Sequence, residues 1–168
     1  DLREFAQLMR ASMTGLPGSF ATLFDDAGRP VVSTVNGALP ANAAPSAIAG
    51  IHAQVRETGR TAVSGLFEGA FGSGPIAAVV VGAPVQGMPM RTIAISMRPT
   101  RFRSLLEATF PATAFVGIVD GDGHFVARVP DHEQYLGALA APDRRAAFER
   151  QPHGVYDGRT REGVRIIA

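Results

Sequence analysis

Apolar residues at the start of the chain recur at steps of three and four positions. Leu2, Phe5, Leu8 and Met9 follow this spacing, which is typical of an amphipathic helix. A glycine at position 15 and a proline two positions later are residues that commonly end a helix. The pattern therefore predicts a helix over 1–15 with one apolar face.

From there the pattern changes to short apolar runs separated by turn residues. Strands are predicted over 19–24, 30–35, 60–67, 76–83 and 89–97. An Asp-Asp-Ala-Gly sequence joins the first two strands and favours a hairpin turn. A helix is predicted between the second and third strands, with Ser46 as its N-cap and Gly59 at its end. These elements would form a five-stranded antiparallel sheet with helices on one face, which is an α+β fold.

A second set of elements follows a helix predicted over 99–109, which begins at a proline and is closed by another. The elements predicted after it are strands near 113–119 and 124–129, short helices opened by Pro130 and capped by Asp143, and strands near 154–159 and 163–168. The second sheet would then lack its last strand. We therefore expect the chain to be a piece of a larger protein.

The second set repeats the first in sequence as well as in order. The block FATLFDDAGRPVV at 20–32 returns as FVGIVDGDGHFVA at 115–127, and GLFEG at 65–69 returns as GVYDG at 154–158. A period of about 95 residues is the size of a small domain and too long for a solenoid repeat. The predicted division is a helix over 1–15, a module over 16–98, a linker helix over 99–109 and a second module over 110–168.

Composition limits the classes of function. Of the 168 residues, 46% are hydrophobic and 18% are charged, and the net charge is +1. This predicts a folded chain and excludes the strongly basic surface typical of nucleic-acid-binding proteins. The absence of cysteine excludes thiolate catalysis and cysteine-based metal sites. The longest apolar run, at 76–85, has about strand length, whereas a membrane span needs roughly 20 residues.

Three segments of the second half carry a resemblance to a known family. They are VDGDGHFVAR at 119–128, DHEQYLG at 131–137 and GVYDG at 154–158. With the doubled order of elements, they resemble the double-Cache sensor domains of bacterial transmembrane receptors. The resemblance implies two tandem PAS-like modules, the first membrane-distal and the second membrane-proximal, preceded by a signalling helix that leads from a membrane span.

For function, the resemblance implies an extracytoplasmic ligand sensor of a histidine kinase, a diguanylate cyclase or a chemoreceptor. The full-length protein would be anchored in the inner membrane with this portion in the periplasm, able to form a homodimer and without catalytic activity in this portion. No cofactor and no nucleic-acid partner are expected. The Tyr, Arg and Asp pattern of amino-acid-binding members is not found in the first module, so an amino-acid ligand is not expected. The alternative is a ligand-free module that serves dimerisation or contact with another protein.

Other candidate sites have simpler interpretations. The DGDG sequence at 120–123 has the alternating carboxylates of a calcium loop, but Asp131 stands where such a loop needs a glutamate. A hairpin turn is favoured there. The glycines at 69–74 are not followed by the lysine of a phosphate-binding loop. No metal-ligand spacing relates the four histidines, which are His52, His124, His132 and His153.

The candidates for ligand binding are polar side chains that a PAS-like module would place near the concave face of its sheet. Arg128 stands at the position that Ser33 has in the first module, on an otherwise apolar strand. An arginine there suits a carboxylate, so the predicted ligand is a small metabolite, with anionic ones among the candidates. The predicted ligand-binding residues are Arg128, Tyr135, Tyr156 and Asp157 in the second module and His52, Arg56, Arg60 and Ser64 in the first.

Overall fold

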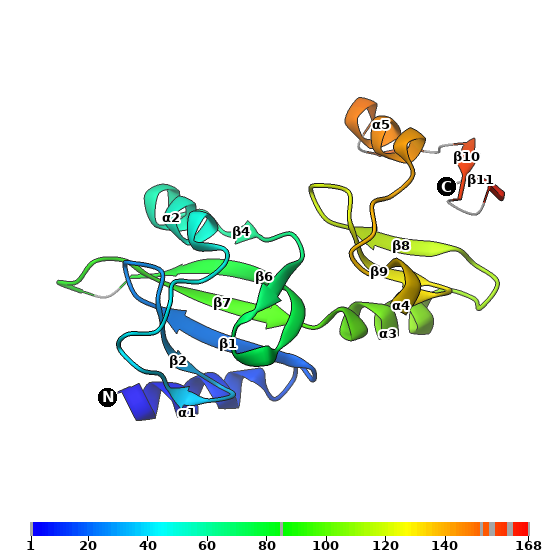
Figure 1. The fold of residues 1–168 in the computed structure, drawn as a ribbon. Coiled ribbons are helices and arrows are strands. Elements are labelled where there is room, and N and C mark those ends of the chain that lie inside the picture. Colours follow the sequence, from blue (N-terminus) through cyan, green and yellow to red (C-terminus); the bar gives the residue numbers. More distant parts are fainter. Residues whose placement is uncertain (1, 85, 152, 155–156, 161–162, 168) are drawn as a thin grey trace.

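The computed structural model describes residues 2–84, 86–151, 153–154, 157–160 and 163–167. Figure 1 shows a large sheet with a helix on each face, then a linker helix and a smaller hairpin unit. The predicted α+β class, with its N-terminal helix, is confirmed. None of the helices in these ranges is long and apolar enough to cross a bilayer.

The large sheet has seven antiparallel strands, in the order β3-β2-β1-β7-β6-β4, with β5 also paired to β6. They are β1 (Ser19–Phe24), β2 (Pro30–Ser33), β3 (Gly37–Ala38), β4 (Ala62–Val63), β5 (Phe67–Gly69), β6 (Gly74–Ala83) and β7 (Arg91–Met97). The strand predicted over 60–67 is divided because the chain turns at Gly65 and Leu66. There the N–H of Leu66 donates a hydrogen bond to Oδ2 of Asp120, at 3.0 Å.

Alternation along β1 assigns the two faces of this sheet. Ala21 and Leu23 pack against α1 (Leu2–Met13) in one apolar cluster. Phe24 belongs to a second cluster with Val55 of α2 (Ala49–Thr58) on the other face. Both faces of β1 are therefore buried, since successive side chains of a strand point to opposite sides. The connecting helix α2 lies on one face of the sheet, and the apolar stripe of α1 covers the opposite face.

For α2, the predicted C-terminal cap is confirmed and the predicted N-terminal cap is wrong. Gly59 has φ +66 and caps the C-terminus, as predicted. Ser46 is not the N-cap, which is Ile48. Instead Oγ of Ser46 accepts a hydrogen bond from the N–H of Ile48, at 3.3 Å, within a turn that precedes the helix.

The remainder of the chain starts with α3 (Pro99–Thr109), the predicted linker helix. The elements after it are β8 (Val116–Val119), β9 (Phe125–Val129), α4 (His132–Tyr135), α5 (Pro142–Arg150), β10 (Asp157–Arg159) and β11 (Arg165–Ile167). Asp143 does not cap α5, whose N-cap is Ala141. Within the described ranges β8 pairs only with β9 and β10 only with β11, so this half has two hairpins where a larger sheet is expected.

The β1–β2 and β8–β9 hairpins are built alike. Oδ1 of Asp25 accepts hydrogen bonds from the N–H groups two and four residues later, at 2.9 and 2.8 Å. Oδ1 of Asp120 accepts the equivalent pair, at 3.0 and 2.9 Å. Register shifts fall at equivalent places, Leu23/Phe24 and Ile118/Val119. The repeat in the sequence therefore encodes a repeated hairpin.

Candidate functional site

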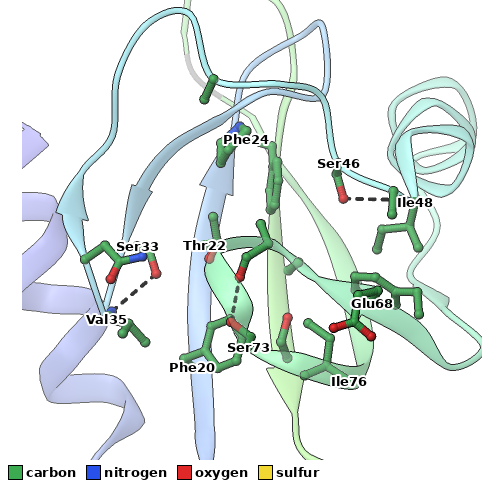
Figure 2. Close-up of a pocket in the computed structure, with 18 of the residues that line it drawn as sticks. Phe20, Thr22, Phe24, Ser33, Val35, Ser46, Ile48, Glu68, Ser73 and Ile76 are labelled. Carbon is green, nitrogen blue, oxygen red and sulfur yellow. Dashed lines mark hydrogen bonds between the residues drawn. The ribbon is translucent and has the colours of Figure 1, made fainter.

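A cavity of about 590 Å³ lies on the α2 face of the large sheet. Strands β1, β2 and β7 form its floor, and the β3–α2 loop and the segment from β5 to the 3₁₀ helix η1 (Ala70–Gly72) form its walls (Figure 2). A volume of several hundred Å³ is typical of a small-molecule site. The cavity is thus large enough to hold a metabolite.

Three hydroxyl-bearing side chains lie on the floor, on neighbouring strands. Thr22 of β1 is the cross-strand partner of Ser33 of β2, and Phe20 of β1 is the partner of Ser96 of β7. Each of the three hydroxyl-bearing residues is at least 93% buried and lines the cavity. Oγ of Ser33 accepts a hydrogen bond from the N–H of Val35, at 3.2 Å. The floor is therefore polar without being charged.

Apolar side chains surround these hydroxyls. The larger ones are Phe20, Phe24, Ile48, Phe67 and Ile76. Figure 2 shows Phe20, Thr22 and Phe24 along the same strand, with Ile48 and Ile76 on the opposite side of the space. Aromatic and branched side chains around a few polar groups are typical of sites that hold an organic molecule.

Charged groups of the cavity are confined to its rim. Among the described lining residues, Glu68 and Arg98 are the only acidic and basic side chains, and both are exposed. Glu68 stands on β5, and Arg98 immediately precedes α3. Because both are in contact with solvent, neither imposes a charge requirement on the floor.

His52, a predicted ligand residue, lies behind the cavity wall. It is completely buried, its ring stacks against Phe24 with 4.2 Å between centroids, and its Nδ1 lies 2.8 Å from Oγ1 of Thr92. Burial, and to a lesser extent the positive charge of Arg56, lowers the pKa of His52 to about 4. His52 therefore supports Phe24 as a neutral core residue and does not line the cavity.

The other predicted residues of the first module also lie outside the cavity. Arg56 is half-buried one turn after His52, and Arg60 is exposed just after the end of α2. Ser64 is buried, but its Oγ accepts a hydrogen bond from the N–H of Ala78 at 2.8 Å, which extends the β4–β6 pairing. None of the three lines this cavity. Arg56 and Arg60 lie on or just after α2, and Ser64 stabilises the sheet.

Arg128 and Tyr135 are brought together in the second half, but around very little space. The guanidinium carbon of Arg128 lies 3.8 Å from the ring centroid of Tyr135, and both residues are about 95% buried. Phe125 meets the Tyr135 ring edge-on, with 6.2 Å between centroids. The adjoining cavity, next to Gly117, measures about 20 Å³, which holds about one water molecule. Arg128 also borders an open groove with His132 and others.

Comparison of the two hairpins explains this difference. Arg128 pairs with Gly117 across β8 and β9 just as Ser33 pairs with Thr22 across β1 and β2. Where the first hairpin has a small side chain beside a large cavity, the second has an arginine stacked on a tyrosine. Arg128 lies against the Tyr135 ring and borders both the cavity of about 20 Å³ and the open groove, which measures about 400 Å³. Its assignment as a ligand-binding group stays a prediction.

Replacing Arg128 with methionine should lower the free energy of unfolding by about 1–2 kcal/mol, since a desolvated cation–π contact is lost while the aliphatic bulk remains. Chemical denaturation of the variant and of Arg29→Met, a change at an exposed arginine, measures the difference. An Arg128→Met variant as stable as the unaltered protein would contradict the stacking role.

The remaining predicted residues are Tyr156 and Asp157. Tyr156 lies outside the described residues. Asp157 is exposed on β10, and its two carboxylate oxygens accept hydrogen bonds from Arg165 at 3.0 and 2.6 Å. This hydrogen bonding lowers the pKa of the Asp157 carboxyl. Asp157 therefore closes the β10–β11 hairpin and does not face the large cavity.

The Asp120 carboxylate of the DGDG sequence accepts the hydrogen bonds that form the turn. Oxygen and nitrogen ligand atoms of Asp120, Asp122 and His124 lie within 4.8 Å of one another. Both oxygens of Asp120 already accept backbone hydrogen bonds, two within the turn and one from Leu66. Burial opposes ionisation of Asp120, but these hydrogen bonds prevail and lower its pKa. The hairpin-turn interpretation is supported.

Two residues on the floor of the cavity were not predicted from the sequence. Thr22 and Ser96 each sit on a strand among apolar neighbours, in SFATLF and RTIAISM. A signal was available, because both are polar residues two positions from an apolar residue of the same strand, Phe20 and Phe24 for Thr22 and Ala94 for Ser96. What the sequence could not show is that β1 and β7 lie side by side.

The comparisons with known proteins concern the fold. No protein-family model and no curated protein sequence matches the chain. Among solved structures, the extracellular domain of a protein described as a histidine kinase, rpHK1S-Z16, has a TM-score of 0.73 at 14% identity, over 97% of this chain and 69% of that one. The ligand-binding domain of Pseudomonas fluorescens chemoreceptor CtaA, in complex with L-leucine, has a TM-score of 0.64 at 13% identity, over 96% and 67%.

A third solved structure is the ligand-binding domain of the Pseudomonas aeruginosa amino-acid chemoreceptor PctC in complex with GABA. Its TM-score is 0.60 at 18% identity, over 94% of this chain and 69% of that one. Identities this low establish a shared fold and leave the ligand of this chain open. The chain has the fold of the extracellular ligand-binding domains of histidine kinases and chemoreceptors, as the Cache resemblance implies.

Proposed function

We propose that the chain is the extracytoplasmic ligand-sensing domain of a bacterial signal-transduction receptor, and that its ligand binds in the cavity of the first module. The observation that carries the proposal is the cavity of about 590 Å³ with hydroxyl-bearing residues on its floor. Similar structures come from receptors and hold small molecules, L-leucine and GABA among them. In this proposal the chain is a tandem of modules at 16–98 and 110–168, and the receptor is anchored in the inner membrane with this portion in the periplasm.

The function assigned to this portion is binding, not catalysis. The charged groups lining the cavity, Glu68 and Arg98, are exposed at its rim. General acid–base catalysis needs a titratable group beside the reacting atoms. Hydroxyls on a sheet and apolar walls are suited to binding a small molecule.

A ligand screen with a blocked variant tests the proposal. Ala43 lines the cavity from the β3–α2 loop, whereas Ala41 of the same loop is exposed and does not. Compounds that bind the native state raise the melting temperature with concentration. We expect a hit to stabilise the unaltered protein and Ala41→Trp, but not Ala43→Trp, because the tryptophan occupies the cavity.

A hit that stabilises Ala43→Trp as strongly as the unaltered protein would place the binding site elsewhere. A screen without any hit would favour the ligand-free alternative, in which the module serves dimerisation or protein contact. The two tryptophan variants carry the same chemical change, so non-specific effects of the ring cancel in the comparison.

A further inference from the structure

The hydroxyls of Thr22 and Ser96 lack protein partners and are accessible from the cavity. Both residues are at least 93% buried, and within the described part of the chain neither hydroxyl makes a hydrogen bond. Neither hydroxyl oxygen is among the fully buried unpaired atoms, so each keeps contact with the space of the cavity that its residue lines. Both hydroxyls are therefore available to a group that occupies the cavity.

The positions of these hydroxyls limit the group that can satisfy them. Thr22 lies opposite Ala94 of β7, two residues from Ser96 on the same face. Diagonal neighbours of this kind lie roughly 7–8 Å apart. Hydroxyls both donate and accept hydrogen bonds. A hydroxyl, amide or carbonyl group seated between them, directly or through a water molecule, would satisfy both.

The floor offers no counter-charge to an ion. The described acidic and basic side chains of the lining stand at the exposed rim, and His52 behind Phe24 is held in the neutral form. At the start of α2, the N–H groups of Ile48 and Ala49 already donate to Ser46. An ionised group on this floor would lose its hydration without compensation.

We propose that the ligand is an uncharged molecule, with an apolar aromatic or branched body among the phenylalanines and a neutral hydrogen-bonding group on Thr22 and Ser96. This inference rests on the proposed function and specifies its ligand class. Such a ligand differs from an amino acid, whose ammonium and carboxylate groups would both need partners. A zwitterion would have to bind at the rim instead, where Glu68 and Arg98 are exposed.

Four compounds with one carbon skeleton test the charge requirement. They are 3-phenylpropan-1-ol and 3-phenylpropanamide, which are neutral, 3-phenylpropanoate, which is an anion, and L-phenylalanine, which is a zwitterion. Isothermal titration calorimetry at neutral pH compares their affinities for the unaltered protein. We expect both neutral compounds to bind at least roughly tenfold more tightly than the anion and the zwitterion, because an uncompensated charge must be desolvated.

Hydroxyl deletions test the contact itself. Thr22→Val keeps the shape of the side chain and removes the hydroxyl, and Ser96→Ala is a second deletion on β7. Each should weaken 3-phenylpropanamide by about three- to tenfold, the loss of one hydrogen bond. Thr100→Val makes the matched change at an exposed position of α3 and should leave the affinity unchanged. Thermal unfolding of each variant without ligand verifies that it is folded.

The outcomes separate this inference from the proposed function. Tighter binding of the anion or the zwitterion, abolished by Ala43→Trp, would overturn the ligand class while supporting a sensor cavity. Neutral binding that both hydroxyl deletions leave unchanged would overturn the role of Thr22 and Ser96. If none of the four compounds binds, the inferred class is wrong, and the screen with Ala43→Trp and Ala41→Trp still decides the proposed function.

Discussion

Replacing Asp120 with alanine is expected to lower the free energy of unfolding by about 3–5 kcal/mol, because three hydrogen bonds to a charged group are lost. The Asp120 side chain is only 4% exposed, and its carboxylate binds the N–H groups of Asp122, His124 and Leu66. The first two bonds lie within the turn. The third joins the β8–β9 hairpin to the segment that leads into β5.

The repeat supplies a matched control for this change. Asp25 makes the same two turn bonds, so Asp25→Ala should cost about 1–2 kcal/mol, as expected for two hydrogen bonds in a more exposed turn. The excess in Asp120→Ala then measures the contact with Leu66. Chemical denaturation of both variants gives the two values, and equal losses would contradict a stabilising contact between the repeats.

Two further variants isolate the contact with Leu66. Asp120→Asn keeps the size of the side chain, but an amide N–H₂ facing the Leu66 N–H cannot accept its hydrogen bond. A Cβ at Gly65 would lie 2.9 Å from Oδ2 of Asp120, so Gly65→Ala should displace the same carboxylate. Both should destabilise the protein, while Gly50→Ala, at a position with open space, should not. Leu66 directly precedes the cavity residues Phe67 and Glu68, so this contact joins the cavity wall to the second hairpin.

Destabilisation by acid is expected to begin near pH 6.5, above the range in which carboxyl groups titrate. The pKa of His52 is lowered from 6.5 to about 4 in the folded state, mainly by burial. Between these values the unfolded chain binds a proton that the folded chain does not, so stability falls as pH falls. The His52 contribution to the free energy of unfolding should be complete above pH 6.5 and decrease by about 3 kcal/mol by pH 4.

Denaturation at several pH values, together with NMR titration of the His52 ring, measures this effect. His52→Gln should reduce the slope between pH 6.5 and 4, although it also removes the stacking on Phe24. Burial lowers the pKa of His132 as well, so His132→Gln separates the second contribution. A His52 ring that titrates near 6.5 in the folded protein would contradict the prediction.

Local features of the fold were predictable because neighbouring residues produce them. The turns at Asp25 and Asp120 depend on a side chain bonding to N–H groups two and four residues later, so the sequence repeat predicts the repeated hairpin. Gly59 and Pro99 mark helix ends for similarly local reasons, a left-handed φ and a fixed φ at the first turn. The sequence around 60–67 did not predict the division of this strand, where Leu66 bonds to Asp120 from the second half of the chain.

The site shows the same division between sequence and tertiary structure. From the sequence alone, Arg128 in place of Ser33 was recognised as the notable difference between the repeats, but the sequence does not show what the Arg128 side chain packs against. Whether a large side chain lines a cavity or fills it depends on what packs against it, here Tyr135 at 3.8 Å. Likewise the hydroxyls of Thr22 and Ser96 face one cavity only because β1 and β7 pair. Sequence determined the repeated hairpins through local hydrogen bonds, whereas long-range packing decided which of them has room for a ligand.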